Sequence, residues 1–110
     1  MTFDYPQLVA NLSKEERIRF YELLANNLTV NVRSIWSDEN LSDAQKVDCM
    51  RWLNEIMQGV VQKSAALRSG RHSYSDEECW ESINHCLLQS PAIDEHVEWA
   101  IKASYERCFH

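Results

Sequence analysis

The sequence predicts an all-α fold: an antiparallel four-helix bundle-like domain of two long and two shorter helices, with a short N-terminal helical flap. Apolar residues recur at steps of three and four along most of the chain, which is the period of an α-helix. Three segments open with a Ser followed three residues later by Glu or Gln, the pattern of a helix-capping box. The 110 residues include only two glycines and two prolines, too few for the tight turns of an antiparallel sheet. This length corresponds to one domain, residues 1–110.

The longest predicted helix lies between Ser42 and Gly70. Ser42 and Gln45 form a capping box at its start, and Gly70 follows Arg68 at its end as a stop signal. The helix has about 26 residues and a length of about 39 Å. Its predicted buried stripe is Val47, Met50, Leu53, Ile56, Met57, Val60, Ser64 and Leu67. Such a rod cannot bury this stripe alone, so we expect the other helices to pack on it.

A second long helix is predicted from about Lys14 to Trp36, behind the capping box of Ser13 and Glu16. Its expected core positions are Tyr21, Leu24, Leu28, Val32 and Ile35. Residues 28–33 also alternate between apolar and polar, as a half-buried strand would. We favour the helix because no second segment offers a strand for pairing. Residues 1–12 are expected to form a single helical turn that lies across the bundle.

Two shorter helices are predicted after Gly70. The first follows a capping box at Ser75 and runs to about Gln89, with Cys79, Trp80, Ile83, Cys86 and Leu87 on its buried side. The second begins at Ser90 and Pro91, and buries Ile93, Val97, Ala100, Ile101, Ser104 and Cys108.

The unequal helix lengths predict an uncovered end. The last two helices, of about 14 and 17 residues, reach only about 21–26 Å along the 39 Å rod. We therefore expect apolar residues to be under-covered where the two long helices meet: Val32, Ile35, Trp36, Val47, Met50 and Leu53. Since soluble monomers rarely expose a large apolar patch, this end is predicted to contact a second copy or another protein. Steep crossing of the last two helices would instead cover the whole rod, and this alternative stays open.

Five residues are predicted to make the partner contacts: Trp36, Val47, Met50, Trp52 and Trp99. Four tryptophans are many for this length, and exposed aromatic side chains are enriched at binding hot spots. Trp99 lies opposite Val97 and Ile101 on a helical wheel. The alternative is that the tryptophan rings lie flat under a loop or the N-terminal flap.

A basic cluster at the end of the central helix is a weaker candidate for binding an anion: Lys63, Arg68, Arg71 and His72. The simpler interpretation is that these cations complement the negative end of the helix dipole.

Charge and composition limit the partners and the compartment. The net charge of −6 disfavours nucleic acid and anionic membranes as partners. The chain shows neither a signal-peptide pattern nor an apolar run of about 18 residues, so we expect a cytoplasmic protein without a membrane span. The four cysteines form no C-x-x-C pair and are expected to be reduced.

Motifs for chemistry are absent from the sequence. Cys79 and Cys86 lie two helical turns apart, about 10.5 Å, which is too far to share a metal ion. Glu81 and His85 form only an exposed pair one turn apart. With no nucleophile motif and no glycine-rich phosphate loop, we expect no enzyme, no metal and no cofactor.

The resulting hypothesis is a small acidic cytosolic non-enzymatic protein that acts through protein–protein binding. It would be an inhibitor, an immunity-type protein, a regulator or an accessory subunit, and it would self-associate. The alternative is a small-molecule binder that holds its ligand between helices near Arg68 and His72. A nucleic-acid regulator is a third interpretation, which the charge disfavours.

Overall fold

The computed structural model describes residues 4–70 and 75–109, and this part of the chain is helical without a strand. The elements are α1 (Tyr5–Ala10), α2 (Lys14–Trp36), α3 (Asp43–Ser69), α4 (Asp76–Gln89), the 3-10 turn η1 (Pro91–Ile93) and α5 (Asp94–Arg107). The predicted all-α bundle of two long and two shorter helices with an N-terminal helical flap is therefore confirmed.

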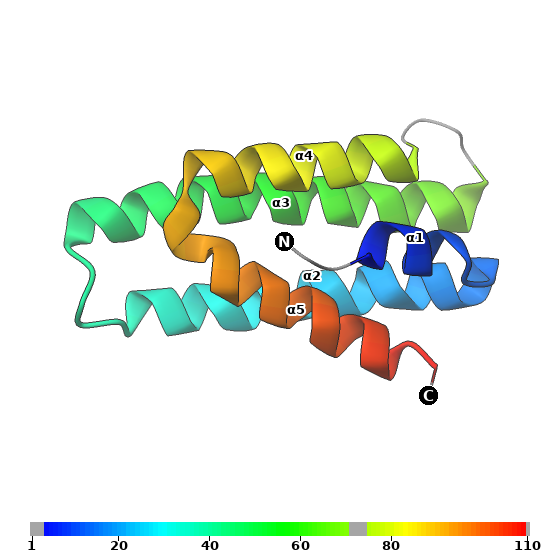
Figure 1. Ribbon diagram of the computed structural model, residues 1–110, viewed down its shortest axis with the longest axis horizontal. Coiled ribbons are helices and arrows are strands. Elements are labelled where there is room, and N and C mark those ends of the chain that lie inside the picture. Colours follow the sequence, from blue (N-terminus) through cyan, green and yellow to red (C-terminus); the bar gives the residue numbers. More distant parts are fainter. Residues whose placement is uncertain (1–3, 71–74, 110) are drawn as a thin grey trace.

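The four main helices run antiparallel in chain order (Figure 1). The long helices α2 and α3 form a hairpin, α4 packs along α3, and α5 crosses α2 obliquely. The α1 turn fills the space beside the start of α4. The molecule measures 41 × 27 × 23 Å along its principal axes, so its longest dimension is close to the length of the hairpin.

Capping interactions begin the helices where the sequence predicts. The backbone N–H of Glu16 donates to Ser13 Oγ over 3.2 Å, and Ser13 N–H donates to Glu16 Oε1 over 3.0 Å. Ser42 and Gln45 form the same reciprocal pair at 3.2 and 2.8 Å. Gly70 ends α3 with φ of 72°, a left-handed conformation that glycine adopts without steric cost.

Residues 28–33 are helical, so the strand alternative is wrong. Two asparagines of α2, a residue type with poor helix propensity, make specific hydrogen bonds to α5. Asn31 is buried, and its Nδ2 donates to the His96 carbonyl oxygen over 2.9 Å. Asn27 Nδ2 donates to Ser104 Oγ over 2.9 Å. Tertiary hydrogen bonds thus compensate for the poor helix propensity of Asn.

The buried stripe of α3 differs from the predicted one. The buried residues are Cys49, Leu53, Ile56, Val60, Lys63 and Ala66. Val47 is exposed, and Met50, Met57, Ser64 and Leu67 are only half-buried. The stripe is rotated because α4 packs on one side of α3, so the side away from α4 stays partly open.

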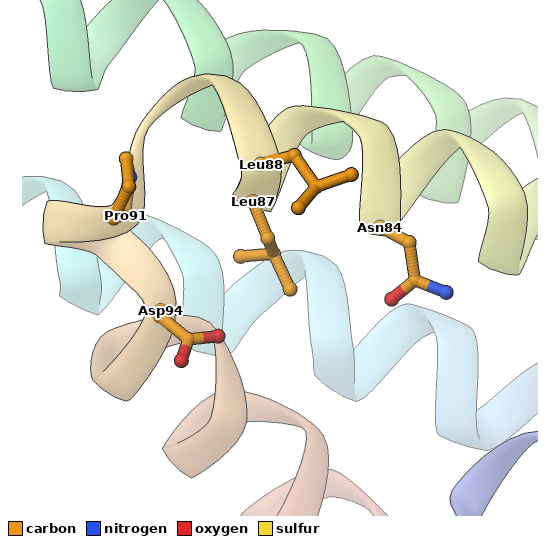
Figure 2. Close-up of a pocket in the computed structure, with 5 residues that line it drawn as sticks. All are labelled: Asn84, Leu87, Leu88, Pro91 and Asp94. Carbon is orange, nitrogen blue, oxygen red and sulfur yellow. The ribbon is translucent and has the colours of Figure 1, made fainter.

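The last helix begins with a corner rather than with an α-helical turn. Pro91 starts the 3-10 turn η1, and α5 follows from Asp94 (Figure 2). This leaves α5 with 14 residues, fewer than the sequence predicts. Its predicted buried face is nevertheless confirmed, since all six of those residues are buried.

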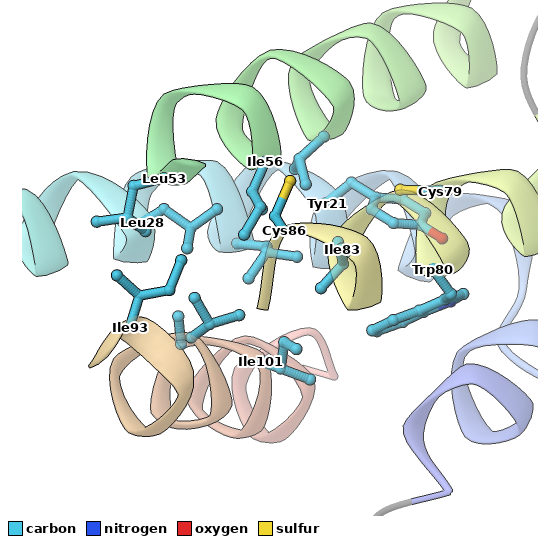
Figure 3. Close-up of a cluster of buried hydrophobic side chains, with 14 of the residues drawn as sticks. Tyr21, Leu28, Leu53, Ile56, Cys79, Trp80, Ile83, Cys86, Ile93 and Ile101 are labelled. Carbon is cyan, nitrogen blue, oxygen red and sulfur yellow. The ribbon is translucent and has the colours of Figure 1, made fainter. Parts of the chain in front are cut away.

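The far end of the hairpin is covered in part. Ile35 and Leu53 are fully buried, and Ile93 of η1 belongs to the same buried cluster as Leu53 and Leu28 (Figure 3). Trp36 and Val47 remain exposed, and Figure 1 shows the α2–α3 end extending past the η1 corner. Both expected effects therefore occur. The oblique crossing of α5 covers the inner side of the hairpin end, and the shorter length of α4 and α5 leaves the outer side of that end open.

Replacing Leu28 by Ala should lower the free energy of unfolding by about 2–5 kcal/mol, because Leu28 is fully buried and its removal leaves a cavity in the core. Urea unfolding followed by circular dichroism measures this loss. Val30→Ala is the matched control on the same helix, since Val30 is exposed and its change should be within about 0.5 kcal/mol. Equal losses in the two variants would contradict the assigned α2 core.

Candidate functional site

The outer side of the α2–α3 hairpin carries a row of exposed apolar side chains, which we call the hairpin face. Its exposed members are Trp36, Val47 and Val61, and its half-buried members are Ala25, Val32, Met50 and Met57. The exposed Asn54 lies midway between Val47 and Val61 on the same side of α3. On α2, the edge toward α5 is marked by Asn27 and Asn31, which bond to that helix. The other edge carries Glu22, which pairs with Arg68 of α3 at 2.6 Å. Trp36 follows Glu22 by about four turns and shares this edge.

Two polar contacts between the long helices bound the hairpin face. Glu22 and Arg68 close its base, and Lys46 Nζ donates to the Trp36 carbonyl oxygen over 3.0 Å at its tip. On α3, Val61 and Val47 precede Arg68 by nearly whole numbers of turns, so they lie along the same side. The face therefore runs along the hairpin from Trp36 and Val47 toward the Glu22–Arg68 pair.

No element in the described part of the chain covers the hairpin face, because α4 and α5 pack on the other side of the hairpin. Trp36 is 48% exposed, Val47 61% and Val61 51%. Val61 was not among the predicted contacts, although its spacing of 14 residues from Val47 places both on one side of a helix.

Trp52 and Trp99 lie away from this face. The half-buried Trp52 ring packs in the seam between α3 and α4, edge-on to His85 with centroids 5.9 Å apart. The Arg51 guanidinium carbon lies 4.9 Å from the Trp52 ring centroid. Trp99 is 49% exposed on the outer side of α5, two residues from the buried Val97 and Ile101. The structure thus brings together Trp36, Val47 and Met50, and separates them from the other two predicted contacts.

The predicted anion cluster has carboxylates beside its described cations. Lys63 is only 5% exposed, and its Nζ lies 2.9 Å from Asp76 Oδ1. Arg68 pairs with Glu22 and lines a pocket of about 490 Å³ that contains both cations and carboxylates. Arg71 and His72 lie outside the described residues. The positive charge available to an anion near Arg68 is therefore reduced by neighbouring carboxylates.

Asp76 is the centre of a polar network that joins three helices. Its Oδ2 lies 3.0 Å from Arg17 Nη1 of α2, and its Oδ1 accepts from Tyr21 OH over 3.1 Å. Lys63 of α3 also pairs with Asp76, through Nζ at 2.9 Å from Oδ1. Burial alone would raise the pKa of the Asp76 carboxyl, but the hydrogen bond and charge of Lys63, the charge of Arg17 and the Tyr21 hydrogen bond together hold that pKa below its ordinary value. Asp76 is therefore the carboxylate that balances a buried lysine.

The four cysteines Cys49, Cys79, Cys86 and Cys108 are free and buried. Burial, with a smaller contribution from Asp76 and against the charge of Lys63, raises the pKa of the Cys79 thiol to about 12. Burial also raises the pKa of Cys86 and Cys108. A buried thiol with a raised pKa is a poor nucleophile, so these three cysteines serve as core residues.

Neither a metal site nor a membrane-spanning helix is found in residues 4–70 and 75–109. Within these ranges, His, Cys, Asp and Glu side chains do not gather in groups of three or more that could hold a metal ion. None of the described helices combines the length and the apolar character needed to cross a bilayer.

Comparison with known proteins found no match: no family model, no curated protein and no solved structure is significantly similar to this chain. We therefore infer function only from the chemistry of its surfaces.

Asp76→Asn should lower the free energy of unfolding by about 3–5 kcal/mol, because it removes the negative charge that lies 2.9 Å from the buried Lys63 ammonium. Chemical denaturation at neutral pH measures the loss. Glu22→Gln removes an exposed ion pair and should cost at most about 1 kcal/mol. A loss for Asp76→Asn no larger than that of this control would refute the structural role of the network.

The stability provided by Asp76 should also depend on pH. Its pKa is lowered in the folded state, so its contribution is fully present above the unfolded value of about 3.9 and is lost as pH falls through the folded value. The difference in unfolding free energy between wild type and Asp76→Asn should be constant near neutral pH and shrink below about pH 4. Denaturation curves from pH 7 to pH 2.5 test this, and a difference that grows on acidification would be the wrong sign.

Proposed function

We propose that this chain is a non-enzymatic binding protein that docks another protein through the hairpin face. One observation supports this most: Trp36, Val47 and Val61 are about half exposed in one row that the described part of the chain leaves uncovered. Single exposed apolar side chains are ordinary on a monomer, whereas an aligned row marks a contact surface.

The composition of the hairpin face agrees with that of protein interfaces. Val47 and Val61 are 14 residues apart, so the row extends for about 21 Å along α3. Trp36 supplies the large aromatic group that anchors many interfaces, and Met50 supplies an adaptable apolar one. The Glu22–Arg68 pair and Lys46 provide a charged rim at the two ends.

The proposal includes self-association, with the subunits joined through their hairpin faces. Two-fold dimers are the commonest oligomers, and they bury the same patch on both subunits. Two hairpins packed face to face would form two layers of two helices, with Trp36 and Val61 buried between the layers. Binding of an unrelated helical protein would use the same side chains.

We also propose a cytoplasmic location. The four cysteines are free and buried, and Cys79 and Cys86 lie on one helix where they do not pair. Free thiols in a small domain are typical of reducing compartments.

Trp36→Ala and Val61→Glu should each weaken assembly at least tenfold, because they remove an aromatic anchor and place a charge inside the contact. Sedimentation velocity over a concentration series measures self-association, and circular dichroism should show nearly unchanged helicity. Purification from the native host with wild type and variant as paired baits tests other partners.

Two exposed positions provide the controls. Val30→Glu changes an equally exposed valine of α2 away from the hairpin face, and Trp99→Glu changes the exposed tryptophan of α5. Both should leave assembly within twofold of wild type. If Trp36→Ala and Val61→Glu retain full assembly and partner binding, the hairpin face is not the docking surface; if Trp99→Glu alone disrupts binding, the contact lies on α5.

A further inference from the structure

A second surface, which we call the α4 groove, runs along the side of α4 that faces away from α3. At the α5 end it is a pocket of about 430 Å³ lined by Asn84, Leu87, Leu88, Pro91 and Asp94 (Figure 2). At the α1 end it is a pocket of about 350 Å³ lined by Pro6, Gln7, Ala10, Asp76, Glu77, Trp80, Glu81 and Asn84. Asn84 lines both pockets, so they adjoin along α4, and the two together are what we call the α4 groove.

The groove exists because α4 and α5 diverge. The chain turns at η1, after which α5 crosses α2 while α4 stays along α3 (Figure 1). The short α1 packs on α4 only near its start. Leu88 is consequently 79% exposed, the highest value among the large apolar side chains of the described residues. Its neighbour Leu87 is half-buried and points into the groove.

The ionisable side chains that line the α4 groove are all carboxylates. Glu77 and Glu81 lie at one end and Asp94 at the other, and no Lys or Arg of the described residues lines either pocket. Asp76 also lines the groove, but Lys63 and Arg17 already neutralise it. The pocket beside Arg68 contrasts with this, because cations and carboxylates alternate there. An occupant must therefore combine apolar side chains with positive charge.

We propose that the α4 groove binds a basic amphipathic helix of another protein, with an apolar stripe on Leu87, Leu88 and Pro91 and with Lys or Arg side chains at the carboxylates. The groove follows a helix of 14 residues, so it accepts a helical segment of about 21 Å. An amphipathic helix in an apolar groove is a common recognition mode, and charge complementarity sets its orientation and speeds its association. A second copy of this acidic chain suits the groove poorly, because it would meet carboxylates of a single sign there, whereas the hairpin face has paired charges at its edge. This inference concerns a different surface from the hairpin face and does not depend on it.

Selection from a random 16-residue peptide library on the immobilised full chain tests the proposal, with counter-selection on the Leu88→Glu variant. The peptides retained by wild type alone should carry net positive charge and apolar residues three or four positions apart. A representative synthetic peptide, labelled for fluorescence anisotropy, should bind Leu88→Glu at least tenfold more weakly than wild type. Glu81→Lys, which is exposed and reverses one charge, should weaken it severalfold.

Matched controls separate this site from general attraction to an acidic protein. Val61→Glu on the hairpin face should leave the peptide affinity unchanged, and so should Glu15→Lys, an exposed charge reversal on α2 that lines the pocket beside Arg68 and not the groove. A scrambled peptide of the same composition should bind at least tenfold more weakly. Retained peptides without a positive bias, equal weakening by Glu15→Lys and Glu81→Lys, or no enrichment over the counter-selection would each overturn the proposal. Self-association that Leu88→Glu abolishes would assign the groove to a second copy and would overturn it as well.

Discussion

The fold depends on how one carboxylate, Asp76, is shared among three helices. Asp76 lies in the first turn of α4, where the helix dipole favours negative charge, and it receives Arg17 and Tyr21 from α2 and Lys63 from α3. A buried lysine is costly unless an anion neutralises it, so the start of α4 must lie over Lys63. From that point 14 residues take α4 only part of the way along α3. The position of the η1 corner, and with it the open end of the hairpin, follows from this anchor.

A second set of polar groups determines the angle at which α5 crosses α2. Asn31 bonds to a main-chain oxygen of α5, and Asn27 bonds to the buried Ser104. Apolar packing alone would accept several crossing angles between α2 and α5, whereas these two directional bonds accept few. They hold α5 across α2 and away from α4. The α4 groove is therefore a result of polar specificity in the core, and Leu88 is exposed because the neighbouring helix is held elsewhere.

Local signals in the sequence were enough to predict the helices, but they could not predict which side of each helix is covered. Capping at Ser13 and Ser42 and the stop at Gly70 are short-range effects, and the structure places them where the pattern does. The buried side of α3 depends instead on α4, which is remote in sequence. Lys63 shows the difference: it continues the spacing of Ile56 and Val60 on the buried stripe, yet its charge favours a place in the anion-binding cluster, because its partner Asp76 lies on α4 and is remote in sequence. The grouping of Trp36, Val47 and Met50 followed from the helix lengths, whereas Trp52 required knowledge of His85 across the seam.

The two open surfaces differ in chemistry because they arise from different constraints. The hairpin face combines exposed apolar side chains with mixed charge at its ends, so its affinity would come mainly from burial of Trp36 and the valines and would depend weakly on salt. The α4 groove places Glu77, Glu81 and Asp94 around an apolar strip, so association there would slow as ionic strength rises. Since α3 and α4 lie between the two surfaces, one small partner cannot contact both. Occupants of both surfaces would sit on opposite sides of the hairpin and would share no contact residue, which favours independent binding over competition.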